Sequence, residues 1–193
     1  LLVASNVNRQ LPALTQTLGM EKIRAMAERL HAINPRITVH LVDEFLSADN
    51  VAALLAQPPT VVLDCIDDVK AKIALILHCR FHKIPLVVAG GAGGKIDPLK
   101  IRVADLARTE CDPLLAKIRS KLRRDYNMCK KPKDKFGVTC VYSIEQPYQP
   151  EACTAGGLQC GGYGSATAMT ASVGLVAVAE VLKMIQKKRC STD

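Results

Sequence analysis

Polar side chains that could bind a triphosphate occur near the start of the sequence. A donor-rich segment with little apolar content contains Asn6, Arg9 and Gln10, and Lys22 follows at the expected start of a helix. An arginine can fork onto phosphate oxygens and a lysine can act as a point charge, so these residue types suit phosphate binding. Taken singly, however, Arg9 and Lys22 are better explained as surface charges.

Acidic side chains follow an apolar run at residues 60–64, which we expect to be a strand. Asp67 would lie beyond the carboxyl end of that strand, where ligands bind in open parallel sheets. Its carboxylate could hold Mg²⁺ or accept a hydrogen bond from a ribose. For Asp68 the pattern favours a structural role, as the N-cap of a helix that begins at Val69.

Alternating apolar patterns predict the elements that must position these groups. We expect helices over 19–33, 48–56, 69–82, 113–126 and 165–188, and strands over 37–42, 60–64, 84–89, 100–104 and 138–142. The β-branched runs 60–64 and 84–89 are typical of strands buried on both faces. This order predicts an α/β fold, a Rossmann-like, doubly wound and mainly parallel sheet with helices on both faces. The glycine cluster 90–94 is better explained as a structural turn than as a phosphate cradle, because Pro98 prevents a long helix from starting directly after it.

Composition narrows the class of protein. The 193 residues suit a single domain, 1–193, and with 49% apolar and 23% charged residues general disorder is excluded. The longest apolar stretch, Ser172–Leu182, is short of the roughly 20 residues that a bilayer requires, so we expect no membrane span.

The eight cysteines include no CxxC pair, which argues against a zinc ribbon. We expect Cys65 and Cys79 to be buried and the protein to work in a reducing cytoplasm. Cys153 and Cys160 belong to a glycine-rich stretch around 154–165, expected to be a mobile loop. A thiol there could form a mixed disulfide with a partner protein.

Positive charge is concentrated in one segment. Residues 117–135 carry nine lysines and arginines against two aspartates, a net +7 of the chain's +8. Such a basic segment is the electrostatic signature of a polyanion partner, although a solvated helix face is the alternative. Tyr126 and Phe136 flank it and could stack on bases. The candidate nucleic-acid contacts are Arg119, Arg123, Arg124, Lys130 and Lys131.

Together these motifs resemble the ThiF-type adenylating superfamily, which includes the ubiquitin-activating enzymes. Its N-x-N-R-Q-like element, helix lysine and D-x-x-D strand end match Asn6–Gln10, Lys22 and Asp64–Asp67. More narrowly, the chain resembles bacterial tRNA threonylcarbamoyladenosine dehydratases. The stretches that carry this likeness are 83–87, 90–98, 105–107, 112–114, 141–145 and 164–167.

The resemblance implies an ATP- and Mg²⁺-dependent reaction on tRNA, in which the threonylcarbamoyl carboxylate beside the anticodon is adenylated and then cyclised with loss of AMP. It implies that Arg9 and Lys22 neutralise the triphosphate, that Asn6 and Gln10 orient phosphates, and that Asp67 holds Mg²⁺. It also implies a homodimer and gives the basic segment 117–135 a tRNA partner.

Two departures from the family pattern bear on the alternatives. Activators of small ubiquitin-like sulfur-carrier proteins usually have two CxxC pairs, which this chain lacks. The family's first strand, its glycine-rich nucleotide loop, the acidic residue after its second strand and an N-terminal arginine would all precede Leu1, so the sequence as given is expected not to bind ATP normally. The missing CxxC pairs disfavour a carrier-protein activator and suit the tRNA branch of the family. A carrier-protein activator and a non-catalytic Rossmann-like binding module are kept as alternatives.

Overall fold

A computed structural model describes residues 1–129, 131, 134–148 and 164–190. The chain divides into two compact units, Leu1–Phe45 and Leu46–Asp193, which are described separately below.

The first unit is built around a single helix. Its elements are η1 (Ala4–Asn6), η2 (Thr15–Thr17) and α1 (Lys22–Ile33), and its small core contains Leu2, Ala13 and Ala25. The helix expected over 19–33 is therefore confirmed. The strand expected over 37–42 is wrong: this segment has no regular structure, and Leu41 and Val42 are exposed. A strand needs a neighbour to satisfy its backbone, and no strand occurs anywhere in residues 1–45.

The second unit contains a four-stranded sheet in the order β1-β2-β4-β3. Strands β1, β2 and β4 are mutually parallel, and β3 pairs antiparallel with β4. In chain order the helices and strands are α2 (Val51–Leu54), β1 (Val62–Asp64), α3 (Val69–Phe81), β2 (Leu86–Ala89), η3 (Pro98–Lys100), β3 (Ile101–Asp105), η4 (Leu106–Arg108), α4 (Pro113–Asp125), β4 (Thr139–Ser143) and α5 (Thr167–Arg189). The mixed but mainly parallel α/β sheet is as expected.

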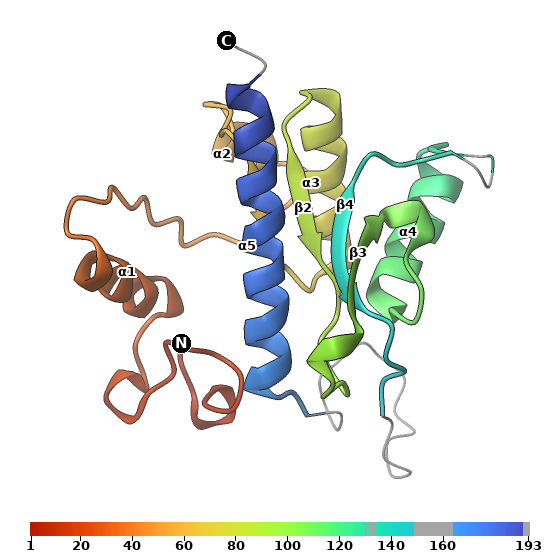
Figure 1. Cartoon of the computed structure of the whole chain (residues 1–193). Coiled ribbons are helices and arrows are strands. Elements are labelled where there is room, and N and C mark those ends of the chain that lie inside the picture. The colour runs from red at the N-terminus through yellow and green to blue at the C-terminus, as the bar shows by residue number, and fades with distance from the viewer. Residues whose placement is uncertain (130, 132–133, 149–163, 191–193) are drawn as a thin grey trace. The chain divides into compact units, whose positions relative to one another are not determined.

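Helices cover both faces of this sheet (Figure 1). On one face Val87, Ala89 and Val141 pack with α5. The alternating residues Leu86, Val88, Cys140 and Tyr142 belong to the core that includes α3 and α4. Strand β2 is fully buried as expected, whereas β1 is the outer strand of the described sheet and its Leu63 is partly exposed, so burial of β1 on both faces is corrected.

Helix α5 is the one described helix that is long and apolar enough to cross a membrane by length and composition. It reaches well beyond the expected Ser172–Leu182 stretch. Core helices pass the same test, and Met169, Val173 and Ala177 of α5 are buried against the sheet. Leu175, Val178 and Leu182 of the same helix are exposed, so packing against the sheet accounts for one side of α5 and not for its whole apolar surface.

Candidate functional site

The carboxyl ends of the three parallel strands meet at one edge of the sheet in the second unit. Asp64 ends β1, Gly90 follows β2, and Ser143 ends β4. Ligands bind beyond this edge in open α/β sheets, so it is the natural place for a functional site.

A buried ion pair fixes the end of β1. The Lys72 Nζ atom lies 3.0 Å from Asp64 Oδ1, and both side chains are completely inaccessible to solvent. Lys72 also donates to the Asp64 carbonyl at 3.4 Å, and the Ile66 amide donates to Asp64 Oδ1 at 2.9 Å. The second oxygen, Asp64 Oδ2, is buried and has no hydrogen-bond partner among the described residues. The loop that leaves β1 therefore starts from a firmly held carboxylate.

The two aspartates that follow differ in role. Asp68 caps α3, because its Oδ1 accepts a 2.8 Å hydrogen bond from the Ala71 amide, as the sequence indicates. Asp67 is exposed and lies in the sequence between Asp64, which pairs with Lys72, and Asp68, which caps α3. Its carboxylate is thus presented to solvent by a loop that is anchored at both ends.

The glycine-rich turn after β2 packs against the start of α4. A Cβ atom on Gly90 would lie 2.3 Å from Asp112 Oδ2, and the Gly91 amide donates to that oxygen at 2.9 Å. Gly94 has a φ of +71°, and a Cβ there would lie 2.9 Å from the Tyr148 carbonyl oxygen. Close packing and a left-handed backbone therefore require these glycines, which favours the structural turn over a phosphate cradle.

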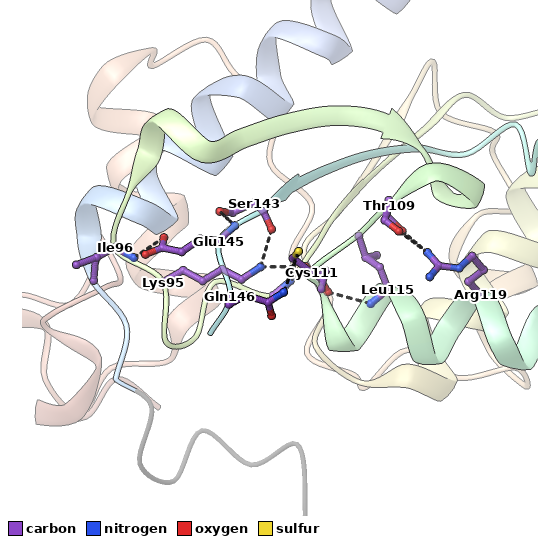
Figure 2. A network of polar contacts seen from close by, with 11 residues as sticks. Lys95, Ile96, Thr109, Cys111, Leu115, Arg119, Ser143, Glu145 and Gln146 are labelled. Atoms are coloured by element: carbon purple, nitrogen blue, oxygen red, sulfur yellow. Dashed lines mark hydrogen bonds and ion pairs between the residues drawn. The ribbon is translucent and has the colours of Figure 1, made fainter. Parts of the chain in front are cut away.

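A second buried lysine ties this turn to β4 and α4 (Figure 2). Lys95 Nζ donates to the Ser143 carbonyl at 2.9 Å and lies 3.7 Å from Asp112 Oδ2. Burial lowers the pKa of Lys95, and the nearby Asp112 carboxylate opposes that shift. Glu145 adds two contacts, because its Oε2 accepts from the amides of Ile96 and Asp97 at 3.0 and 2.9 Å.

In the first unit, the donor-rich segment is held by its own hydrogen bonds. Asn6 is buried, and its Oδ1 accepts from the Val3 amide at 3.1 Å. Arg9 donates through Nη1 to the Ser5 carbonyl and to Asn8 Oδ1. Gln10 is partly exposed. Asn6 thus shapes the segment with an inward-facing side chain, a role that the sequence did not reveal.

Lys22 is exposed at the first residue of α1 and lines a hollow of about 260 Å³ in the first unit. The hollow also includes Glu21, Asp43, Glu44 and Phe45. Arg9 and Lys22 belong to the first unit and Asp67 to the second.

The basic segment lies on α4 and the chain that follows it, and its arginines are not equivalent. Arg119 Nη1 donates to the Thr109 carbonyl at 2.8 Å, to Thr109 Oγ1 at 2.6 Å and to the Leu106 carbonyl at 3.2 Å. Arg119 therefore fixes α4 to η4 through one of its guanidinium nitrogens, and its expected contact with tRNA stays a prediction. Arg123 stacks over the Phe136 ring, with 5.6 Å between its Cζ atom and the ring centroid.

Arg124 is exposed and pairs with Asp125 at 2.6 Å. With Ala116, Arg119, Ser120 and Arg123 it lines an open hollow of about 480 Å³ on α4. The exposed side of this helix thus presents a concentration of positive charge around a surface depression.

Several other expectations are corrected or lie outside the described residues. Phe136 is completely buried under Arg123 and is not available to stack on a base, whereas Tyr126 is exposed. Cys65 is exposed, because β1 ends at Asp64 and Cys65 begins the loop; Cys79 is buried as expected. Among the expected functional residues, those outside the described part are Lys130, Cys153 and Cys160.

Sequence reasoning missed the two buried lysines, Lys72 and Lys95. A usable signal was present, because Lys72 directly precedes the apolar run 73–77 and Lys95 directly follows the glycine-rich turn 90–94. A lysine at such a position is buried only if it is paired.

A mainly parallel sheet between helices, with polar groups gathered at its carboxyl edge, defines a Rossmann-like α/β fold. The chain belongs to the ThiF family, whose model matches residues 3–192.

Several similar proteins are tRNA threonylcarbamoyladenosine dehydratases. The chain is 43% identical over 193 residues to the tRNA threonylcarbamoyladenosine dehydratase of Haemophilus influenzae, covering 97% of this chain and 74% of that protein. It is 45% identical over 196 residues to the enzyme of the same name from Escherichia coli, covering 95% and 73%. Similarity to the molybdopterin-synthase adenylyltransferase of Escherichia coli, at 36% identity, spans only 43% of this chain.

Solved structures agree with these similarities. The crystal structure of the Escherichia coli tRNA N6-threonylcarbamoyladenosine dehydratase in complex with ATP matches all of this chain and 74% of its own, with a TM-score of 0.90 and 43% identity. The complex of that enzyme with AMP matches 97% of this chain with a TM-score of 0.87 and 44% identity.

Proposed function

We propose that this protein is an ATP-dependent enzyme that adenylates threonylcarbamoyladenosine in tRNA and cyclises it with loss of water. The observation that carries the proposal is similarity of at least 43% identity, over nearly the whole chain, to dehydratases of this name, one of them crystallised with ATP. A second complex of that enzyme contains AMP, which is the product expected when the adenylated substrate cyclises.

In this reaction the substrate carboxylate attacks the α-phosphorus of ATP and pyrophosphate leaves. A nitrogen of the substrate then attacks the activated acyl carbon, and AMP departs with the carboxylate oxygen. The overall change is loss of one water from the modified nucleoside. No protein nucleophile is needed, so the enzyme contributes positioning and charge stabilisation.

Within this proposal, Arg9 and Lys22 neutralise the triphosphate and the charge that develops at the α-phosphorus. Gln10 orients a phosphate, while the inward-facing Asn6 maintains the shape of the segment that carries Arg9. These roles follow from the family motif and from the basic or amide character of the side chains.

Magnesium fits the acidic end of β1. Asp67 offers an exposed carboxylate, and carboxylate oxygens are the ligands that Mg²⁺ uses together with substrate phosphates. The metal would supply charge neutralisation at the triphosphate. Asp67 would hold it, and the Asp64–Lys72 pair would keep the Asp67 loop in place.

For tRNA, side chains of the basic segment would contact phosphates, which gives affinity that does not depend on the base sequence. The side chains proposed for this role are Arg123, Arg124, Lys130 and Lys131. Arg119 would contribute by fixing α4. We also propose a single functional domain over 1–193, a homodimer, a cytoplasmic location and a protein partner that is bound through Cys153 or Cys160.

The alternative is activation of a small sulfur-carrier protein, which the partial similarity to a molybdopterin-synthase adenylyltransferase favours. The two functions are separated by assaying AMP release from the full protein that contains this chain. Release that needs threonylcarbamoyladenosine-containing tRNA supports the proposal, and release that needs a small ubiquitin-like sulfur-carrier protein supports the alternative. Arg9→Ala and Lys22→Ala should each abolish turnover while leaving the fold intact, and near-normal rates in both would refute their assignment.

A further inference from the structure

The Lys95 ammonium is at the centre of a network that joins three parts of the second unit. It contacts the Ser143 carbonyl at the end of β4 and the Asp112 carboxylate at the start of α4, while its own backbone continues the glycine turn after β2. The Lys95 residue is 1% exposed, and the Asp112 side chain is fully buried. An unpaired charge in such a place would be costly, so each of these two groups requires the other.

Asp112 connects this network to the start of α4. Its Oδ1 caps the helix by accepting from the Leu115 amide at 3.0 Å, and its Oδ2 accepts from the Gly91 amide at 2.9 Å. One carboxylate therefore sets both the start of α4 and the position of the glycine turn. Farther along the same helix, Arg119 fixes α4 to η4. A helix that is held near its start and again at Arg119 has a defined direction.

We propose that Lys95 and Asp112 form a positioning pair, which holds the basic face of α4 at a fixed place relative to the carboxyl edge of the sheet so that both act on one tRNA. The inference rests on the proposed tRNA function. Neither side chain touches the substrate, because both are buried. Without the Lys95 charge, Asp112 would turn toward water and release Gly91 and Leu115, and α4 would lose its fixed starting point.

The test compares Lys95→Met, Asp112→Asn and the double variant in the full protein that contains this chain. KM for threonylcarbamoyladenosine-containing tRNA should rise about 10-fold or more in each single variant, because small misplacements of binding groups have large effects. KM for ATP should stay within about twofold of the parent. The double variant should be no worse than the poorer single variant, since the two groups act as a unit.

Two further variants serve as controls. Lys100→Met removes an exposed lysine from the same segment and should change neither constant. Lys95→Gln keeps a donor for the Ser143 carbonyl but lacks the charge, and it replaces Lys95→Met if that variant does not fold. A folded Lys95 variant whose KM for tRNA is within twofold of the parent overturns the proposal. Failure of both Lys95 variants to fold also overturns it, because the pair is then needed for the fold itself.

Failure of the proposed function would look different. A parent protein that binds tRNA but does not convert threonylcarbamoyladenosine refutes the reaction while leaving the pair testable through tRNA affinity. The positioning pair alone is refuted if the parent protein converts the nucleoside normally and the Lys95 variants convert it equally well at all tRNA concentrations.

Discussion

Replacement of Lys72 by methionine should destabilise the protein severely. Methionine matches most of the lysine stem, so packing in α3 is largely preserved, but Asp64 is left as a buried charge without its partner 3.0 Å away. Breaking a buried pair in this way costs about 3–5 kcal/mol of unfolding free energy. For a chain of this size that is a fall in Tm of roughly 6–20 °C.

The measurement is urea and thermal unfolding followed by circular dichroism. The matched control is Lys70→Met, which removes an exposed lysine from the same helix and should change the unfolding free energy by less than about 0.5 kcal/mol. The double variant Asp64→Asn/Lys72→Met has no charge at positions 64 and 72 and should recover part of the lost unfolding free energy. The reasoning is refuted if Lys72→Met costs less than about 1 kcal/mol, or if the double variant is no more stable than Lys72→Met.

Three other predictions concern function and reactivity. Asp67→Asn should lose Mg²⁺-dependent adenylation with little change in the unfolding free energy. Asp68→Ala should lose about 1 kcal/mol of unfolding free energy, because it removes the cap of α3. Loss of adenylation in Asp68→Ala together with loss of stability in Asp67→Asn would show that the two roles are exchanged. Changing Arg124 and Lys131 to Gln should flatten the slope of log K for tRNA against log salt by about 2 units while ATP affinity is unchanged, and an identical slope would favour a solvated face. Burial raises the pKa of Cys79 to about 11, so its thiol stays protonated and should resist iodoacetamide at pH 8 in peptide mass mapping; rapid labelling in the native state would contradict its burial.

The parts of the fold that could be predicted are those with strong local signals. The Asp112–Pro113 pair marks the start of α4, because aspartate caps the helix and proline suits its first position. Strand β2 follows from an apolar run bounded by Pro85 and the glycine turn. Such signals act over a few residues and do not depend on the rest of the molecule.

The parts that could not be predicted depend on tertiary partners. The segment 37–42 has strand-forming residues but no strand beside it. In the sequence, Arg119 cannot be told from the other basic residues of α4, because its hydrogen bond to Thr109 forms only in the folded chain. Phe136 is likewise expected to be free to stack on a base, because its burial depends on the folded core. Lys95 and Asp112 are seventeen residues apart in the sequence, and Lys95 also bonds to Ser143 at the end of β4, so this network forms only when the sheet is assembled.

The central claim is tested most directly by one measurement on the full protein that contains this chain. The protein is incubated with ATP, Mg²⁺ and tRNA that contains threonylcarbamoyladenosine, and the nucleosides are analysed by mass spectrometry under conditions that preserve the cyclic product. The account predicts a modified nucleoside lighter by one water, formed together with one AMP for each nucleoside converted and only when ATP is present. An unchanged nucleoside mass, with an active dehydratase of Escherichia coli converting the same tRNA in parallel, would contradict it.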